Sequence, residues 1–200
     1  MTKGLTLWNA LVTALLDELR ALPQERIDYF WSTPSKRTEG YLASDQGLLP
    51  RIAQRLGMVF TPEVRRIDGE FKYMADGFPQ IFAEVENNAS SIAESELEKL
   101  CYVRAPLKLI ITVCPWPNPE LRDRWLKVIA DCAKEWLPES PEVVYGFIIG
   151  ECRWEEQVDS PQRPGLFFHL FAVSSAGELV DERPQEFIRW FSEAASTPGS

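Results

Sequence analysis

The chain has very little histidine and no closely spaced cysteines, and both absences exclude whole classes of site. Its 200 residues contain one histidine, His169, so zinc and iron sites built from several histidines are excluded. No GxSxG motif accompanies His169, which lies in an apolar run and is predicted to be a strand residue. The four cysteines are widely spaced, without a CxxC pair, and we expect them to be buried free thiols.

Long apolar runs are absent as well. No segment approaches the roughly 20 apolar residues of a membrane helix, so we expect no membrane association. The apolar stretch near the N-terminus is interrupted at Asn9 and Asp17, and no cleavage site of small residues follows it. This pattern predicts an amphipathic helix and not a signal peptide, and the expected location is the cytoplasm.

Positive charge is scarce. Lysine and arginine number 21 against 30 acidic residues, a formal net charge of -9, which argues against nonspecific coating of nucleic acid. Basic residues nevertheless gather in the sequence around residues 66–86, and this basic group comprises Lys36, Arg37, Arg51, Arg55, Arg65, Arg66 and Lys72. The basic group is consistent with a rim that meets phosphates and equally with an ordinary mixed surface.

What the chain does have is apolar residues, at 45% of the sequence with seven tryptophans and eleven phenylalanines, enough for one domain with a large core. Apolar periodicity predicts helices over 8–22, 24–31, 48–56, 91–105, 119–136 and around 187–191. Strands are predicted over 58–60, 66–73, 81–86, 107–113, 143–150 and 166–173, with a further short strand after residue 177. Residues 32–40 are predicted to be a loop.

The most informative feature is a predicted hairpin formed by residues 66–73 and 81–86. Both segments alternate in polarity, and residues 75–79 supply turn-forming residues. A loop centred on Asp76 places Asp68 opposite Glu84 and Arg66 opposite Glu86. Because opposed like charges destabilise a sheet, a divalent cation between the carboxylates is the simplest explanation.

A structural interpretation of the same acids remains open. It is a solvated sheet face that Arg66 and Lys72 neutralise across the strands. Glu70 is expected to be an exposed neighbour. The charged residues of the following helix are expected to form its wet face, and they are Glu94, Glu96, Glu98 and Lys99.

The order of elements and the positions of the acids resemble the PD-(D/E)XK phosphodiesterase superfamily, the fold of many restriction enzymes and repair nucleases. Asp68 matches the first acid of its motif and Glu84 the second, whereas Glu86 stands where lysine is usual, which gives a Glu-x-Glu variant. The resemblance covers about residues 43–113. It implies a three-layer α/β sandwich around a mixed sheet, with an αβββαβ core, extra N-terminal helices and C-terminal strands and a helix. We expect one domain over 1–195 and a disordered tail over 196–200.

The chemistry that this resemblance implies is metal-dependent hydrolysis of a phosphodiester bond in DNA or RNA. Asp68, Glu84 and the carbonyl of Val85 would hold Mg²⁺ or Mn²⁺, which activates a bound water. Glu86 would orient that water, act as a base or help to bind a second ion. Lys72 would supply the cation that the motif lysine usually provides, and Lys99 is a second candidate, although it falls opposite the apolar stripe of its helix.

Two other functions remain open. The missing lysine and the acidic balance favour a non-catalytic module that keeps the nuclease fold and binds nucleic acid. The aromatic second half of the chain favours an acidic interaction subunit that docks on another protein, or a homodimer. Nothing in the sequence distinguishes a DNA substrate from an RNA substrate.

Overall fold

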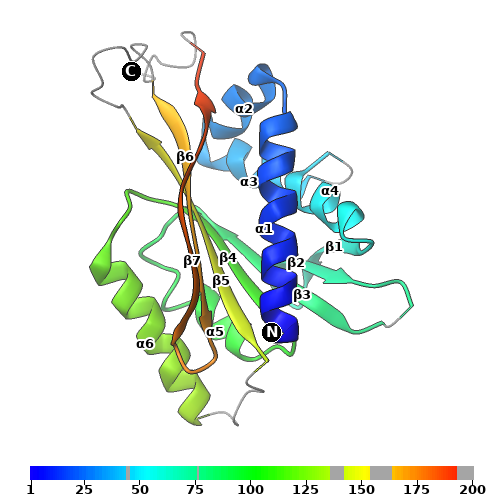
Figure 1. Ribbon diagram of the computed structural model, residues 1–200, viewed down its shortest axis with the longest axis vertical. Coiled ribbons are helices and arrows are strands. Elements are labelled where there is room, and N and C mark those ends of the chain that lie inside the picture. Colours follow the sequence, from blue (N-terminus) through cyan, green and yellow to red (C-terminus); the bar gives the residue numbers. More distant parts are fainter. Residues whose placement is uncertain (44–45, 76, 136–141, 154–163, 193–200) are drawn as a thin grey trace.

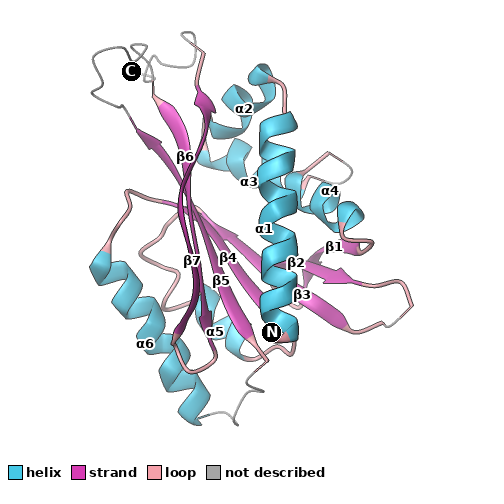
Figure 2. Cartoon of the chain, in the orientation of Figure 1, coloured by secondary structure: helices cyan, strands magenta, loops and turns pink. Residues whose placement is uncertain are grey.

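Seven strands form one mixed sheet in the computed structural model, which describes residues 1–43, 46–75, 77–135, 142–153 and 164–192 (Figure 1). The strands lie in sequence order and helices cover both faces, so the molecule is an α/β sandwich of three layers (Figure 2). The strands are β1 (Val59–Val64), β2 (Ile67–Lys72), β3 (Pro79–Glu86), β4 (Leu107–Val113), β5 (Val144–Arg153), β6 (Gly165–Ser174) and β7 (Leu179–Trp190). The helices are α1 (Lys3–Ala21), α2 (Gln24–Trp31), α3 (Pro34–Leu42), α4 (Leu48–Arg55), α5 (Glu96–Cys101) and α6 (Pro119–Glu135).

The sheet has an antiparallel meander at each end and parallel strands in the middle. β1, β2 and β3 pair antiparallel, β3, β4 and β5 pair parallel, and β6 and β7 return antiparallel. Parallel neighbours need crossover connections, and α5 and α6 provide them. The carboxyl ends of β3, β4 and β5 therefore meet at one edge of the sheet.

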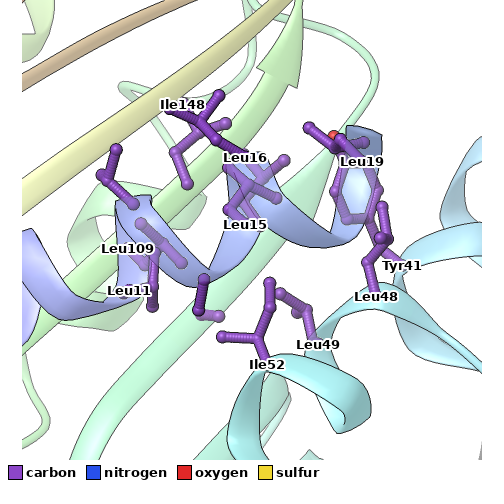
Figure 3. Close-up of a cluster of buried hydrophobic side chains, with 14 of the residues drawn as sticks. Leu11, Leu15, Leu16, Leu19, Tyr41, Leu48, Leu49, Ile52, Leu109 and Ile148 are labelled. Carbon is purple, nitrogen blue, oxygen red and sulfur yellow. The ribbon is translucent and has the colours of Figure 1, made fainter. Parts of the chain in front are cut away.

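One face of the sheet packs against α1 and α4. Leu11 and Leu15 of α1 lie between Leu109 of β4 and Ile52 of α4, and all of them are buried (Figure 3). The apolar stripe predicted for residues 8–22 forms this contact. Truncating one such leucine to alanine is expected to cost about 2–5 kcal/mol of unfolding free energy.

The other face packs against α5 and α6 through stacked aromatic rings. Trp125 of α6 stacks on Phe147 with ring centroids 5.3 Å apart, and Phe147 stacks on Phe171 at 4.6 Å. Trp116, in the loop that precedes α6, is buried and stacks on Trp125. Large aromatic rings therefore account for much of this second core.

Most predicted elements are confirmed, and three are wrong. Residues 34–42 form α3 where a loop is predicted, because Thr33 accepts a hydrogen bond from the amide of Lys36 and Pro34 begins the helix. Gly40 allows the ring of Phe30 to approach, since a Cβ there would lie 2.5 Å from the ring. Tertiary packing thus stabilises a polar segment whose own periodicity is weak.

The helix predicted to begin at Ser91 begins instead at Glu96, after a series of turns. Within these turns the Ser91 hydroxyl donates to the carbonyl of Asn88. The helix predicted around residues 187–191 is part of β7, whose apolar residues Phe187 and Trp190 pack on Phe167 and on each other. The predicted tail, 196–200, lies outside the described residues.

Arg66 lies in a turn, whereas the sequence predicts a strand residue there. β1 extends to Val64, and Arg65 and Arg66 form a two-residue turn with φ of 56° and 67° before β2 begins. Positive φ at both turn residues is typical of a tight hairpin whose twist matches that of its strands. Arg66 therefore does not pair with Glu86. No helix in the described part of the chain is long and apolar enough to cross a membrane.

Candidate functional site

Asp68 and Glu84 lie together on the face of the sheet that α5 covers. Gly69 pairs with Ala83 and Glu70 with Phe82, the register predicted from a loop centred on Asp76. One step further, the Asp68 amide donates to Glu84 Oε2 at 3.4 Å, and the Val85 amide donates to Asp68 Oδ2 at 2.8 Å. The two carboxyl groups therefore converge across neighbouring strands.

Glu84 is a buried acid without sufficient positive charge around it. The residue is 1% exposed. Burial raises the pKa of its carboxyl to about 9, with further increases from the charges of Asp68 and Glu96 and an opposing effect from Lys99. Among the described residues Glu84 Oε1 has no hydrogen-bond partner, since Lys99 Nζ lies 3.7 Å away. An ionised Glu84 would thus be stabilised by a cation at this oxygen.

Glu96 and Lys99 join this pair from α5. Glu96 is 7% exposed and accepts hydrogen bonds from Lys99 Nζ at 2.6 Å and from the Ser95 hydroxyl at 2.8 Å. The predicted wet face is wrong for Glu96, which is buried, and for Lys99, which is half-buried, because the short α5 turns them toward β3. Glu94 and Glu98 are exposed, as predicted. Glu96 and Lys99 are three residues apart, a spacing that places both on one side of a helix. This spacing could be read from the sequence, but the predicted helix began at the wrong residue and concealed it.

The remaining predicted site residues lie around this acidic cluster, which is defined by Asp68, Glu84, Glu96 and Lys99. Glu86 ends β3 half-buried, and its Oε1 accepts from the Asn88 amide at 2.6 Å. Glu70 is buried, although the sequence predicts an exposed residue, and Lys72 Nζ binds its Oε1 at 2.5 Å.

Lys72 forms its ion pair with Glu70, and none joins Lys72 to Asp68 in the described part of the chain. Lys72 is four residues beyond Asp68 along β2, about 13 Å at 3.3 Å per residue. Lys99, within 3.7 Å of Glu84, is the cation beside the carboxylate pair.

The donors present suit a hard divalent cation that completes its shell with water or substrate. Within the described ranges, no group of three histidine, cysteine or acidic residues has the spacing of a metal site. Mg²⁺, however, is usually held by one or two carboxylates together with waters and substrate phosphates. Asp68 and Glu84, whose Oε1 is orphaned, meet that minimum. When its acids are ionised, the cluster carries three formal negative charges and one positive charge.

The cluster lies toward the carboxyl ends of the parallel strands, where open α/β sheets bind ligands. Glu86 pairs with Thr112, Thr112 with Ile149, and Ile149 with His169, so these residues form a row across β3 to β6. His169 is a sheet residue, as predicted, and its Nε2 lies 2.8 Å from Glu151 Oε2.

A shallow depression elsewhere on the molecule contains no residue of the acidic cluster. It lies between α1 and α4 and is lined by Asn9, Ala10, Thr13, Ala14, Asp17, Arg55 and Leu56. Its lining is largely small or apolar, without convergent carboxylates.

Comparisons with protein-family models and with curated protein sequences find no match for this chain. The chemistry of the acidic cluster is therefore interpreted from its own geometry.

Proposed function

We propose that the chain is a metal-dependent phosphodiester hydrolase of the nuclease type. The observation that carries this proposal is the buried carboxyl of Glu84, which lies beside Asp68 with one oxygen lacking a donor among the described residues. A divalent cation would offset the repulsion between the two carboxylates. The order α4, β1, β2, β3, α5, β4 supports the proposal, since it is the order of the nuclease core that the sequence resembles.

Each residue of the cluster has a role in this proposal. Asp68 and Glu84 would hold Mg²⁺ or Mn²⁺, with the Val85 carbonyl as a further ligand, and the Val85 amide orients Asp68 through its 2.8 Å hydrogen bond. The bound ion would polarise a phosphoryl oxygen and lower the pKa of its water. Lys99 would stabilise the negative charge that develops on the phosphoryl group, and Glu96 positions Lys99.

Glu86 is the proposed residue for handling the attacking water. It is half-buried at the end of β3, two residues beyond Glu84 on the same face, and only its Oε1 is engaged by the Asn88 amide. A carboxylate there can accept a proton from water and hold it in line.

Calorimetric titration with Mg²⁺ and Mn²⁺ tests the metal site directly. We expect the wild type to bind either ion and Glu84→Gln to lose this binding, because the amide cannot supply an anionic ligand. Glu70→Gln is the matched control, since Glu70 is also a buried acid of the hairpin but is paired with Lys72. An absence of binding heat for the wild type at millimolar ion would refute the proposed metal site.

A non-catalytic nucleic-acid-binding module is the second candidate. It is favoured by Glu86 at the position where the motif usually has lysine. This candidate predicts that Asp68→Asn and Glu84→Gln leave oligonucleotide binding intact or strengthen it, since both remove negative charge near phosphates. Metal-dependent strand cleavage by the wild type, lost in both variants, would exclude it.

A further inference from the structure

Arg37 of α3 reaches the carboxyl end of β3 from the face of the sheet opposite the acidic cluster. Its Nη1 donates to Asn87 Oδ1 at 2.7 Å, and Asn87 directly follows Glu86. The Asn87 amide nitrogen in turn donates to Thr38 Oγ1 at 2.9 Å and to the Pro34 carbonyl at 3.3 Å. Three hydrogen bonds therefore hold the first turns of α3 against the carboxyl end of β3.

Arg37 differs from the other members of the basic group, which are paired or exposed. Arg65 and Arg66 are exposed in their turn. The paired members are Lys36 with Glu39, Arg51 and Arg55 with Glu18, and Lys72 with Glu70.

Arg37 is half-buried, and its Nε is buried without a hydrogen-bond partner in the part of the chain that the structure describes. No described carboxylate forms an ion pair with it. A partly desolvated cation without a counter-ion is costly, and an anionic ligand would offset that cost.

The Arg37 charge extends along the edge where the parallel strands end. Desolvation raises the pKa of the Tyr41 phenol and of the Cys152 thiol, and the Arg37 charge opposes the shift in each. Cys152 lies near the end of β5, so the Arg37 charge acts at the carboxyl ends of both β3 and β5. A ligand that enters at the carboxyl ends of the strands would meet its guanidinium.

We propose that Arg37 binds a phosphate flanking the scissile one, so that the substrate is a polynucleotide strand and not an isolated phosphodiester. This inference rests on the proposed function. Three residues of extended strand, about 10 Å, separate Glu84 from Asn87, so a polynucleotide that crosses the carboxyl end of β3 would extend from the acidic cluster on one face to Arg37 on the other. The guanidinium group suits the contact because it donates two parallel hydrogen bonds to phosphate oxygens.

Binding of a fluorescein-labelled single-stranded 12-mer, as DNA and as RNA, tests the contact by anisotropy across a salt series in EDTA. For Arg37→Gln we expect about a tenfold weaker affinity and a slope of log affinity against log salt that is smaller by about one unit. The Arg37→Gln side chain ends where the Arg37 Nε lies and loses the bond to Asn87, but Asn87 keeps its bonds to Thr38 and Pro34, and thermal melting checks that α3 stays packed. Lys36→Gln, on the same helix, is the control and should keep the wild-type slope, while Arg37→Lys should recover part of it.

Hydrolysis assays separate this inference from the proposed function. With Mn²⁺, Arg37→Gln should raise KM for the 12-mer about tenfold and leave KM for bis(p-nitrophenyl) phosphate unchanged, because that compound has no flanking phosphate. An Arg37→Gln salt slope equal to that of the wild type, or no binding of the 12-mer by the wild type, would overturn the Arg37 contact. Salt-sensitive binding through Arg37 without hydrolysis by the wild type would instead contradict the proposed hydrolase and leave the Arg37 contact standing.

Discussion

Two buried glutamates in this molecule have opposite surroundings. Glu18 of α1 is 3% exposed and forms ion pairs with Arg51 and Arg55 of α4. Glu84 of β3 is 1% exposed and lies among other acids, with Lys99 at 3.7 Å. Both are acids inside the protein, yet only Glu18 has its charge balanced by the chain itself.

This difference separates a structural ion pair from a candidate binding site. A buried carboxylate is tolerated when cations and hydrogen bonds compensate it, and the arginines of α4 do so for Glu18 while joining α4 to α1. Glu84 stays protonated near neutral pH because its pKa is raised to about 9, and its ionisation requires a cation from outside the chain. We therefore expect substitutions at Glu18 to affect folding and substitutions at Glu84 to affect chemistry.

The largest expected effect is on cleavage. Glu84→Gln and Asp68→Asn should each reduce metal-dependent cleavage by about 1000-fold, since the loss of the ion removes several kcal/mol of transition-state stabilisation. Glu18→Gln should leave the rate unchanged. Single-turnover cleavage of a labelled oligonucleotide measures both, and a Glu84→Gln rate within tenfold of the wild type would contradict the assignment.

The next largest expected effect is on kcat, and it distinguishes the two candidate lysines, Lys72 and Lys99. Lys99→Met should lower kcat by about 100-fold, because Lys99 is the cation beside Glu84, whereas Lys72→Met should change kcat less than about threefold. Lys99→Arg should recover part of the rate. Equal losses in Lys99→Met and Lys72→Met would assign the role to neither lysine specifically.

Stability should respond in the opposite direction at the two glutamates. Glu18→Gln is expected to lower the free energy of unfolding by about 1–3 kcal/mol, since it removes the counter-ion of Arg51 and leaves Arg55 with Asp17 alone. Glu84→Gln should raise the free energy of unfolding of the metal-free protein at pH 8, because the glutamine amide cannot ionise inside the protein. Urea denaturation of both variants in EDTA measures the two changes. A change in unfolding free energy of the same sign for both variants would contradict the difference between Glu18 and Glu84.

Per unit of pH, the smallest expected effect is the dependence of stability on pH. The folded-state pKa of Glu84 lies above its ordinary value, so the unfolded chain ionises first and binds fewer protons. The stability that Glu84 contributes is therefore complete below pH 4.5 and is lost as the pH rises toward about 9, by at most about 1.4 kcal/mol per pH unit. Metal-free wild type should lose stability relative to Glu84→Gln across this window. Parallel pH profiles for the two proteins would contradict the raised pKa.

The hairpin could be predicted from the sequence because its constraints are local. The alternation of β2 and β3 and the turn residues between them are enough to give the register that brings Asp68 to Glu84. The burial of Glu96 could not be predicted in the same way, because it depends on where α5 begins and how that helix lies on β3. Local charge patterns indicate a solvated helix face, and only the tertiary arrangement turns Glu96 inward.

The two ends of the chain show the same limit. α3 is a polar segment whose helix depends on its Thr33 cap and on the close approach of Gly40 to Phe30. β7 contains apolar residues at spacings that suit a helix, but pairing with β6 along one side fixes it as an edge strand. The partner that fixes β7 is not revealed by the sequence of β7 itself, whereas the Thr33 cap and Pro34 of α3 are local signals that its polar composition concealed.

The stacked indoles of Trp116 and Trp125 give the molecule a built-in optical reporter. Their ring centroids are 5.8 Å apart with 12° between the planes, close enough for their excited states to couple. The amide of Trp116 also donates to Glu151 Oε1 at 3.4 Å, which ties this chromophore to the end of β5. Near-ultraviolet circular dichroism should therefore register any displacement of the segment before α6 when an ion or an oligonucleotide is added, without a label.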